Sequence, residues 1–131
     1  MENINTKRQI EEYLQKMTYR LDSHTIQRPV FTIGKGLDLE AEMSITSIYN
    51  DKGYPVKCIL FSLALVDNEE KENFAYAFTF LGKVGDIEFD DILGQLNKSM
   101  KKRLEEMREK NDEGYERVAE LAGRAAFVLF D

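Results

Sequence analysis

The amino-acid sequence predicts an α+β fold: an N-terminal helix, an antiparallel three- or four-stranded β-meander, and then one long kinked or two C-terminal helices packed on the sheet. Three observations carry this prediction. Residues 37–46 alternate between apolar and polar side chains without an exception. A hairpin-turn sequence follows them, and apolar residues at helical spacing stand on both sides of the strand region. No repeat or linker divides residues 1–131, so we expect a single domain.

The first predicted element is a helix that begins after Thr6. Thr6 and Gln9 form a capping box, in which the Thr6 hydroxyl accepts a hydrogen bond from the Gln9 amide while the Gln9 side chain reaches back. Apolar residues then recur at helical spacing. They are Ile10, Tyr13, Leu14, Met17 and Leu21. We expect the helix to end near residues 22–24, before the break at Arg28 and Pro29.

A short apolar run at residues 30–33 precedes the sequence Gly34-Lys35-Gly36. Two interpretations are open: the run is a separate strand that turns into Leu37, or it begins the same strand with a glycine kink.

The alternation at residues 37–46 predicts a half-buried strand, because successive strand side chains point to opposite faces. The next residues, 50–53, are Asn-Asp-Lys-Gly and predict a type I turn closed by a left-handed glycine. Pairing across this turn sets four apolar residues opposite four others, and a one-residue slip would break every pair. The predicted pairs are Ile45–Ile59, Met43–Phe61, Ala41–Leu63 and Leu39–Leu65.

Residues 56–66 are apolar on both faces apart from Lys57 and Ser62, which is typical of a strand inside a sheet. After a polar loop, residues 74–81 alternate again. One face carries Phe74, Tyr76, Phe78 and Phe80, and the other carries Ala75, Ala77, Thr79 and Leu81. We expect the large aromatic face to fill the core and the small face to let a helix approach closely.

We expect Asp86 to cap the next helix. The apolar stripe of this helix is Phe89, Ile92, Leu93, Leu96, Met100, Leu104 and Met107. Gly114 either separates a last helix or kinks a single long one. Residues 125–130 are apolar on all sides, so this tail should be docked in the core, added to a sheet edge, or buried in a partner.

The composition limits the possible functions. The chain has 24 Asp and Glu against 18 Lys and Arg, and its net charge of −6 disfavours binding to nucleic acid or to an anionic membrane. No apolar run approaches the ~20 residues of a membrane-spanning helix, and the N-terminus lacks the apolar core of a signal peptide. The single cysteine cannot form an internal disulfide, which favours a reducing compartment. We therefore expect a cytoplasmic location and no membrane partner.

Motifs that could carry chemistry do not converge. His24, the only histidine, stands beside Ser23 and Asp22, but a catalytic triad needs residues that meet in space. Cys58 lies within the predicted central strand and is interpreted as a small packed side chain. Residues 34–36 lack the spacing of a phosphate-binding loop, and the basic residues at 98–103 are followed at once by acidic ones. We expect no catalytic residue, no metal ion and no cofactor.

The leading hypothesis is a non-enzymatic, small acidic protein-interaction module, of the kind that includes inhibitor, immunity, adaptor and phage-type regulatory proteins. The acidic strand face and an excess of apolar surface favour it. We expect another protein as the partner and self-association as a dimer. The predicted interaction face comprises Asp38, Glu40, Glu42, Phe127 and Phe130.

Two alternatives are open. The first is a small-ligand or nucleotide-binding protein with a pocket formed by Tyr19, Arg28, Lys35 and Tyr76. The second is a metal-dependent enzyme that uses the carboxylates at positions 38, 40 and 42. Strand residues two apart are about 7 Å apart, so these three carboxylates need further donors to hold one ion.

Overall fold

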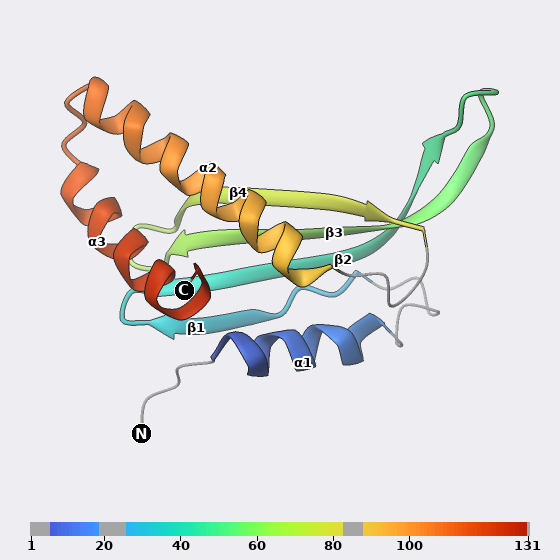
Figure 1. Cartoon of the computed structure of the whole chain (residues 1–131), viewed down its shortest axis with the longest axis horizontal. Coiled ribbons are helices and arrows are strands. Elements are labelled where there is room, and N and C mark those ends of the chain that lie inside the picture. Colours follow the sequence, from blue (N-terminus) through green and yellow to red (C-terminus); the bar gives the residue numbers. More distant parts are fainter. Residues whose placement is uncertain (1–5, 19–25, 83–87, 131) are drawn as a thin grey trace.

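The computed structural model describes residues 6–18, 26–82 and 88–130 of the chain. The helix α1 (Lys7–Thr18) is followed by four strands, β1 (Val30–Gly34), β2 (Leu37–Tyr49), β3 (Pro55–Asp67) and β4 (Glu72–Leu81). The helices α2 (Phe89–Glu109) and α3 (Tyr115–Ala125) come next, and a short π-helical segment, η2 (Ala126–Phe130), ends the described chain (Figure 1). The predicted α+β fold, with its N-terminal helix, meander and C-terminal helices, is confirmed.

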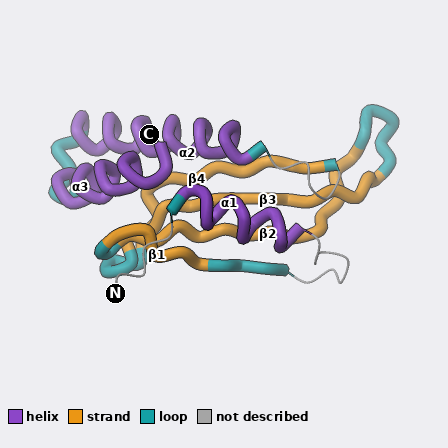
Figure 2. Tube along the Cα trace, turned by 60° about the horizontal axis from the view of Figure 1, so that its bottom comes forward, coloured by secondary structure: helices purple, strands orange, loops and turns teal. Residues whose placement is uncertain are grey.

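The four strands form one antiparallel sheet in the order β1-β2-β3-β4. Figures 1 and 2 together show α1, α2 and α3 on the same side of this sheet, with α2 running obliquely along β4. The molecule therefore has two layers, and none of the described helices lies on the other face of the sheet. We call the face under the helices the covered face and the opposite one the open face.

The helix α1 begins with the predicted capping box. The Thr6 hydroxyl accepts a hydrogen bond from the Gln9 backbone N–H at 3.3 Å, and the Gln9 side-chain oxygen accepts one from the Thr6 N–H at 3.0 Å. Ile10, Leu14 and Met17 of the predicted stripe are buried. Position 21 and the predicted end of the helix at 22–24 lie outside the described residues.

The register of β2 and β3 is the one predicted from the turn. Ile45 pairs with Ile59, and the other three predicted pairs follow along the ladder. The Asn50 N–H donates to the Tyr54 carbonyl at 2.9 Å, and Gly53 has a φ of +80°. Turn chemistry and the apolar pattern select the same register because a slip would move every apolar side chain to the opposite face.

Of the two interpretations of residues 30–33, the separate strand is correct. β1 pairs with β2, and an irregularity between Thr32 and Gly34 leads into the turn at Lys35 and Gly36. Gly36 has a φ of +75°, a conformation that favours glycine.

The covered face and the inner sides of the helices form one apolar core. From the sheet it contains Phe31, Ile33, Leu37, Leu39, Ala41, Met43, Ile59, Phe61, Leu63, Leu65, Phe74, Ala75, Ala77 and Leu81. The helices and the tail add Ile10, Leu14, Met17, Phe89, Ile92, Leu93, Leu96, Met100, Leu121, Ala122, Ala125 and Leu129. As predicted, the small side chains of β4 face a helix, since Ala75 and Ala77 lie under α2 and leave it room to approach.

The prediction that the large face of β4 fills the core is wrong for three of its four aromatic residues. Tyr76, Phe78 and Phe80 lie on the open face and are 48%, 48% and 46% exposed. Phe74 lies at a bulge between the pairs Leu65–Ala75 and Val66–Asn73, so it does not share the open face with the other three rings. Its side chain is buried. The physical reason is that β3 is apolar on both faces, so the pattern of β3 does not indicate which face the helices cover. The packing of α2 decides this, because the small side chains of β4 let α2 come closer to the sheet than the large rings would.

Two separate helices follow the sheet, because α2 ends in a Schellman motif. Asn111 adopts a left-handed conformation with a φ of +51°. Its N–H donates to the Arg108 carbonyl, and the Asp112 N–H donates to the Met107 carbonyl. The Asp112 side chain then accepts a hydrogen bond from the Gly114 N–H at 2.8 Å, directly before α3. The residue predicted to cap α2, Asp86, lies outside the described residues.

The apolar tail docks in the core, the first of the three expected outcomes. Leu129 is buried, and Val128 and Phe130 pack partly buried against the core. Phe127 is the exception, with 78% of its surface exposed.

Candidate functional site

The open face of the sheet is built from parallel columns of side chains, one column per strand. β4 contributes Tyr76, Phe78 and Phe80, which form an aromatic column. Residues of β3 stand directly beside them, because Ala64 pairs with Tyr76, Ser62 with Phe78, and Leu60 with Phe80. β2 adds Asp38, Glu40 and Glu42, which we call the acidic column.

Neighbouring rings of the aromatic column contact one another. The Tyr76 and Phe78 ring centroids are 6.0 Å apart, and the Phe78 and Phe80 centroids are 5.7 Å apart in an edge-to-face arrangement. Such packing gives the rings a defined orientation even though almost half of each side chain is exposed. The column is therefore an ordered apolar surface along one edge of the sheet.

The β3 column is small in its middle and largely shielded by its neighbours. Ser62 is 5% exposed and Cys58 is 7% exposed, although no described helix lies above them. Ser62 lies between its cross-strand partners Glu42 of β2 and Phe78 of β4, which are both larger side chains. The interpretation of Cys58 as a packed side chain is confirmed, since its thiol is free and buried.

Internal partners hold two members of the acidic column. The Arg28 guanidinium is 2.6 Å from a Glu42 carboxylate oxygen, and the Asn68 amide donates to Asp38 at 3.3 Å. Glu40 stands between them and is exposed. Within residues 6–18, 26–82 and 88–130, no three acidic, histidine or cysteine side chains are grouped so that they could hold a metal ion.

The residues of the predicted interaction face do not form one surface. Asp38, Glu40 and Glu42 share the open face, as their alternation predicted. Phe127 and Phe130 belong to η2, which lies on the helical side of the sheet (Figure 1). Phe130 is partly buried against the core and lines a small recess together with residues of α1 and α2.

The three described residues of the predicted ligand pocket, Arg28, Lys35 and Tyr76, lie apart from one another. Tyr19 lies outside the described residues. Arg28 precedes β1 at one edge of the sheet, whereas Tyr76 is on β4 at the other edge. Lys35 is in the turn between β1 and β2, where its carbonyl accepts a hydrogen bond from the Arg124 side chain.

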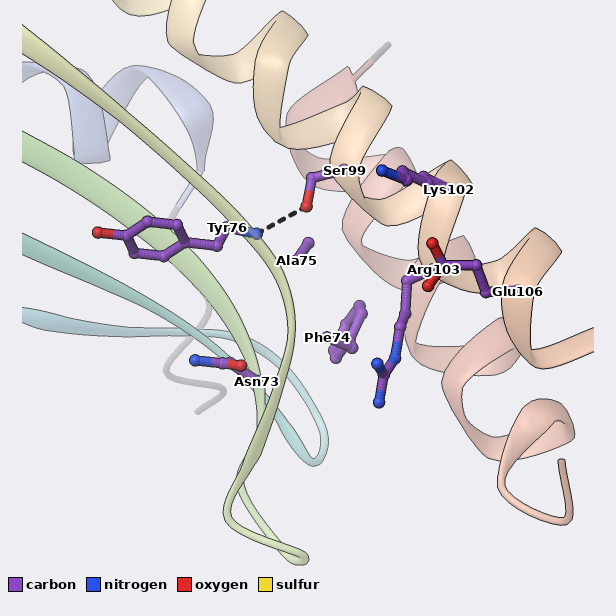
Figure 3. A pocket seen from close by; sticks show the side chains of 8 residues that line it. All are labelled: Asn73, Phe74, Ala75, Tyr76, Ser99, Lys102, Arg103 and Glu106. Atoms are coloured by element: carbon purple, nitrogen blue, oxygen red, sulfur yellow. Dashed lines mark hydrogen bonds between the residues drawn. The ribbon is translucent and has the colours of Figure 1, made fainter.

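An open recess of about 290 Å³ lies between β4 and α2. Its residues include Phe74, Ser99, Lys102, Arg103 and Glu106. Figure 3 shows the Tyr76 ring turned away from α2, while the Phe74 ring lies on the helix side beside Arg103. The Ser99 hydroxyl accepts a hydrogen bond from the Tyr76 N–H at 3.0 Å, so α2 covers part of the free edge of β4.

Sequence reasoning missed an ion-pair cluster at the end of β3. Asp67 is buried, and the Arg117 guanidinium donates to both of its oxygens, at 2.5 and 2.8 Å. The N–H groups of Glu69 and Glu70 donate to the same carboxylate. The hydrogen bonds from Arg117 lower the pKa of Asp67 to about 2, against the opposing effect of burial. The pairing joins positions 50 residues apart in the sequence, and no local pattern signals it.

Comparison of the chain with models of known protein families, with curated protein sequences and with solved structures finds no match. No helix in the described part of the chain is long and apolar enough to cross a membrane.

Proposed function

We propose that this chain is a non-enzymatic protein-interaction module that binds another protein through the open face of its sheet. It belongs, in this proposal, to the functional class of inhibitor, immunity, adaptor and phage-type regulatory proteins, and it works in the cytoplasm. We also propose that it self-associates.

The observation that carries the proposal is the aromatic column. Three adjacent aromatic side chains, each almost half exposed, form one contiguous apolar surface on a face that no described helix covers. Contiguous exposed apolar patches of this kind mark interaction sites, because water contact with them is unfavourable and a partner removes it. Aromatic residues are also the side chains most enriched at binding hot spots.

The acidic column favours a protein over a single-stranded nucleic acid as the partner. Bases stack well on aromatic side chains of an open sheet, but such surfaces combine the rings with basic residues that follow the phosphates. Here Asp38, Glu40 and Glu42 lie two strands away on the same face, and Arg28 is the one cation paired with them among the described residues. Their negative charge would repel a phosphate backbone. In a protein interface, charged residues at the rim orient the partner.

The test is affinity capture from a lysate of the organism that encodes the chain, followed by mass spectrometry and by direct binding of each purified candidate. Wild type is compared with Phe78→Glu and with the matched control Phe127→Glu, which changes an equally large ring on the helical side. We expect a protein that binds wild type and the control and is lost with Phe78→Glu. Retention of every captured protein by a folded Phe78→Glu variant would contradict the proposal.

A further inference from the structure

The side chains of the aromatic column are larger than the β3 side chains that stand directly beside them on the open face. Tyr76 stands beside Ala64, and Phe78 stands beside Ser62, since these residues are direct cross-strand partners. Phe80 stands beside Leu60 in the same way. A ridge of three rings thus runs next to a line of smaller side chains at residues 60–64 of β3.

We propose that a second copy of this chain covers the open face, and that the two copies pack face to face about a two-fold axis parallel to the strands, between β3 and β4. This inference rests on the proposed function, in which the open face binds a protein, and it identifies a second copy of the chain as one such partner. A rotation about such an axis preserves height along the strands. It therefore sets Phe78 of each copy over Ser62 of the other, and Tyr76 over Ala64, to within the twist of the sheets.

The charges of the open face fit this arrangement. The axis leaves the two acidic columns at opposite rims, three strand spacings apart, or roughly 14 Å with the ordinary spacing of strands. This separation exceeds the screening length at physiological ionic strength, so the carboxylates of the two copies repel only weakly. The centre of this interface is therefore apolar and its two rims are charged, which matches the apolar core and polar rim of interfaces generally.

Two other symmetric arrangements are less favourable. An axis across the strands would set each strand over its own counterpart, so that Glu40 and Glu42 of the two copies would oppose each other. Edge-to-edge pairing of β4 would need its outward N–H groups, but the Tyr76 N–H already donates to Ser99 of α2.

The exposed area suits a modest dimer. Aromatic side chains bury about 150–250 Å² each when fully covered, so the half-exposed column leaves roughly 300 Å² per copy. Two copies supply roughly 600 Å² from these rings alone, about half of the lower limit for a stable interface, which is the size of a weak, transient contact.

The test is light scattering of the purified full chain across about 5–500 μM, where mass action shifts a modest dimer. We expect the mass to rise from 15.2 kDa toward twice that value. Phe78→Glu should raise the dimer dissociation constant about 30-fold or more, because it removes a hot-spot ring and inserts a charge. Phe127→Glu is the matched control and should leave that constant unchanged.

Glu40→Lys distinguishes the axis. In the proposed arrangement position 40 lies at the rim, so the dissociation constant should change by less than about threefold. If the copies cross as in the alternative axis, this variant relieves repulsion and tightens the dimer, which would overturn the proposed geometry.

The experiments give different results if something other than a second copy covers the open face. A chain that stays monomeric at about 100 μM overturns the second-copy inference. If such a monomer still captures another protein through Phe78, the proposed binding of another protein stands, while the proposed self-association fails. If instead a single-stranded oligonucleotide binds and Phe78→Glu abolishes that binding, both the second-copy inference and the protein-binding proposal fail.

Discussion

The two faces of the sheet both carry apolar side chains, but these side chains are buried to different extents. On the covered face, Leu63 and Leu65 of β3 are completely buried beneath the helices. On the open face, Leu60 of the same strand is partly exposed, and the three rings at the β4 edge are almost half exposed. Alternation alone generates both faces, so the difference shows that the position of the helices decides which apolar residues become core and which remain exposed.

Leu63→Ala should have a large effect on stability. Leu63 is completely buried on the covered face, so the change removes apolar contacts and leaves a cavity under the helices. We expect the free energy of unfolding, measured by urea denaturation, to fall by about 3 kcal/mol. The same substitution at Leu60, which is partly exposed on the open face, is the control and should cost about 1 kcal/mol. Equal losses at the two positions would contradict the distinction between the faces.

Asp67→Asn should have the next largest effect, because it removes the charge that pairs with Arg117 while keeping an oxygen that can accept from the loop N–H groups. We expect the free energy of unfolding near pH 7 to fall by about 2 kcal/mol. Glu69→Gln changes a more exposed partner of the same guanidinium and should have a smaller effect.

This loss should depend on pH. Folding lowers the pKa of Asp67 from 3.8 to about 2, so its contribution is fully present above pH 4. It is lost as the pH falls through the interval between these two values. The difference in stability between wild type and Asp67→Asn should therefore shrink from pH 4 to pH 2, as followed by urea unfolding at each pH. A difference that stays constant over this interval would contradict the assigned pairing.

Gly53→Ala tests the turn that assigns residues to the two faces. Gly53 has a φ of +80°, and a Cβ atom there would meet nothing within 4 Å, so the cost is conformational only. We expect a loss of about 1 kcal/mol in the free energy of unfolding. Gly53→Asn should cost less, because asparagine tolerates the left-handed conformation. If both variants lose the same amount, the backbone conformation is not the cause.

Phe78→Ser should have the smallest effect on the folded monomer. The ring is half exposed on the open face, so at concentrations where the chain is monomeric its loss should cost less than about 1 kcal/mol. Phe61→Ser removes a ring that is completely buried on the covered face and serves as the comparison. A Phe78→Ser loss as large as that of Phe61→Ser would mean that the open face belongs to the core of the monomer.

Local patterns predicted much of the fold. The capping box at Thr6 and the register set by Asn50 and Gly53 were predicted correctly, because each depends on residues close in sequence or on a pattern that tolerates no slip. The acidic column was placed correctly for the same reason.

The interaction face was predicted only in part. Periodicity shows which side chains share a face, but a strand that is apolar on both sides does not indicate which side the helices cover. The rings of Tyr76, Phe78 and Phe80 were therefore assigned to the core, and the rings of Phe127 and Phe130 were grouped with a surface on the opposite side of the sheet. The Asp67–Arg117 pair was missed because it forms only when α3 packs beside the β3–β4 loop.

The sequence by itself determined the start of α1, the β2–β3 register and the acidic character of one strand face, since short-range capping and turn chemistry and strict alternation leave no alternative. Only the tertiary structure decided that all described helices lie on one side of the sheet and that the aromatic column stays open. The physical reason is that α2 buries its apolar stripe best where Ala75 and Ala77 permit close approach, and this long-range packing choice turns the larger rings toward the open face.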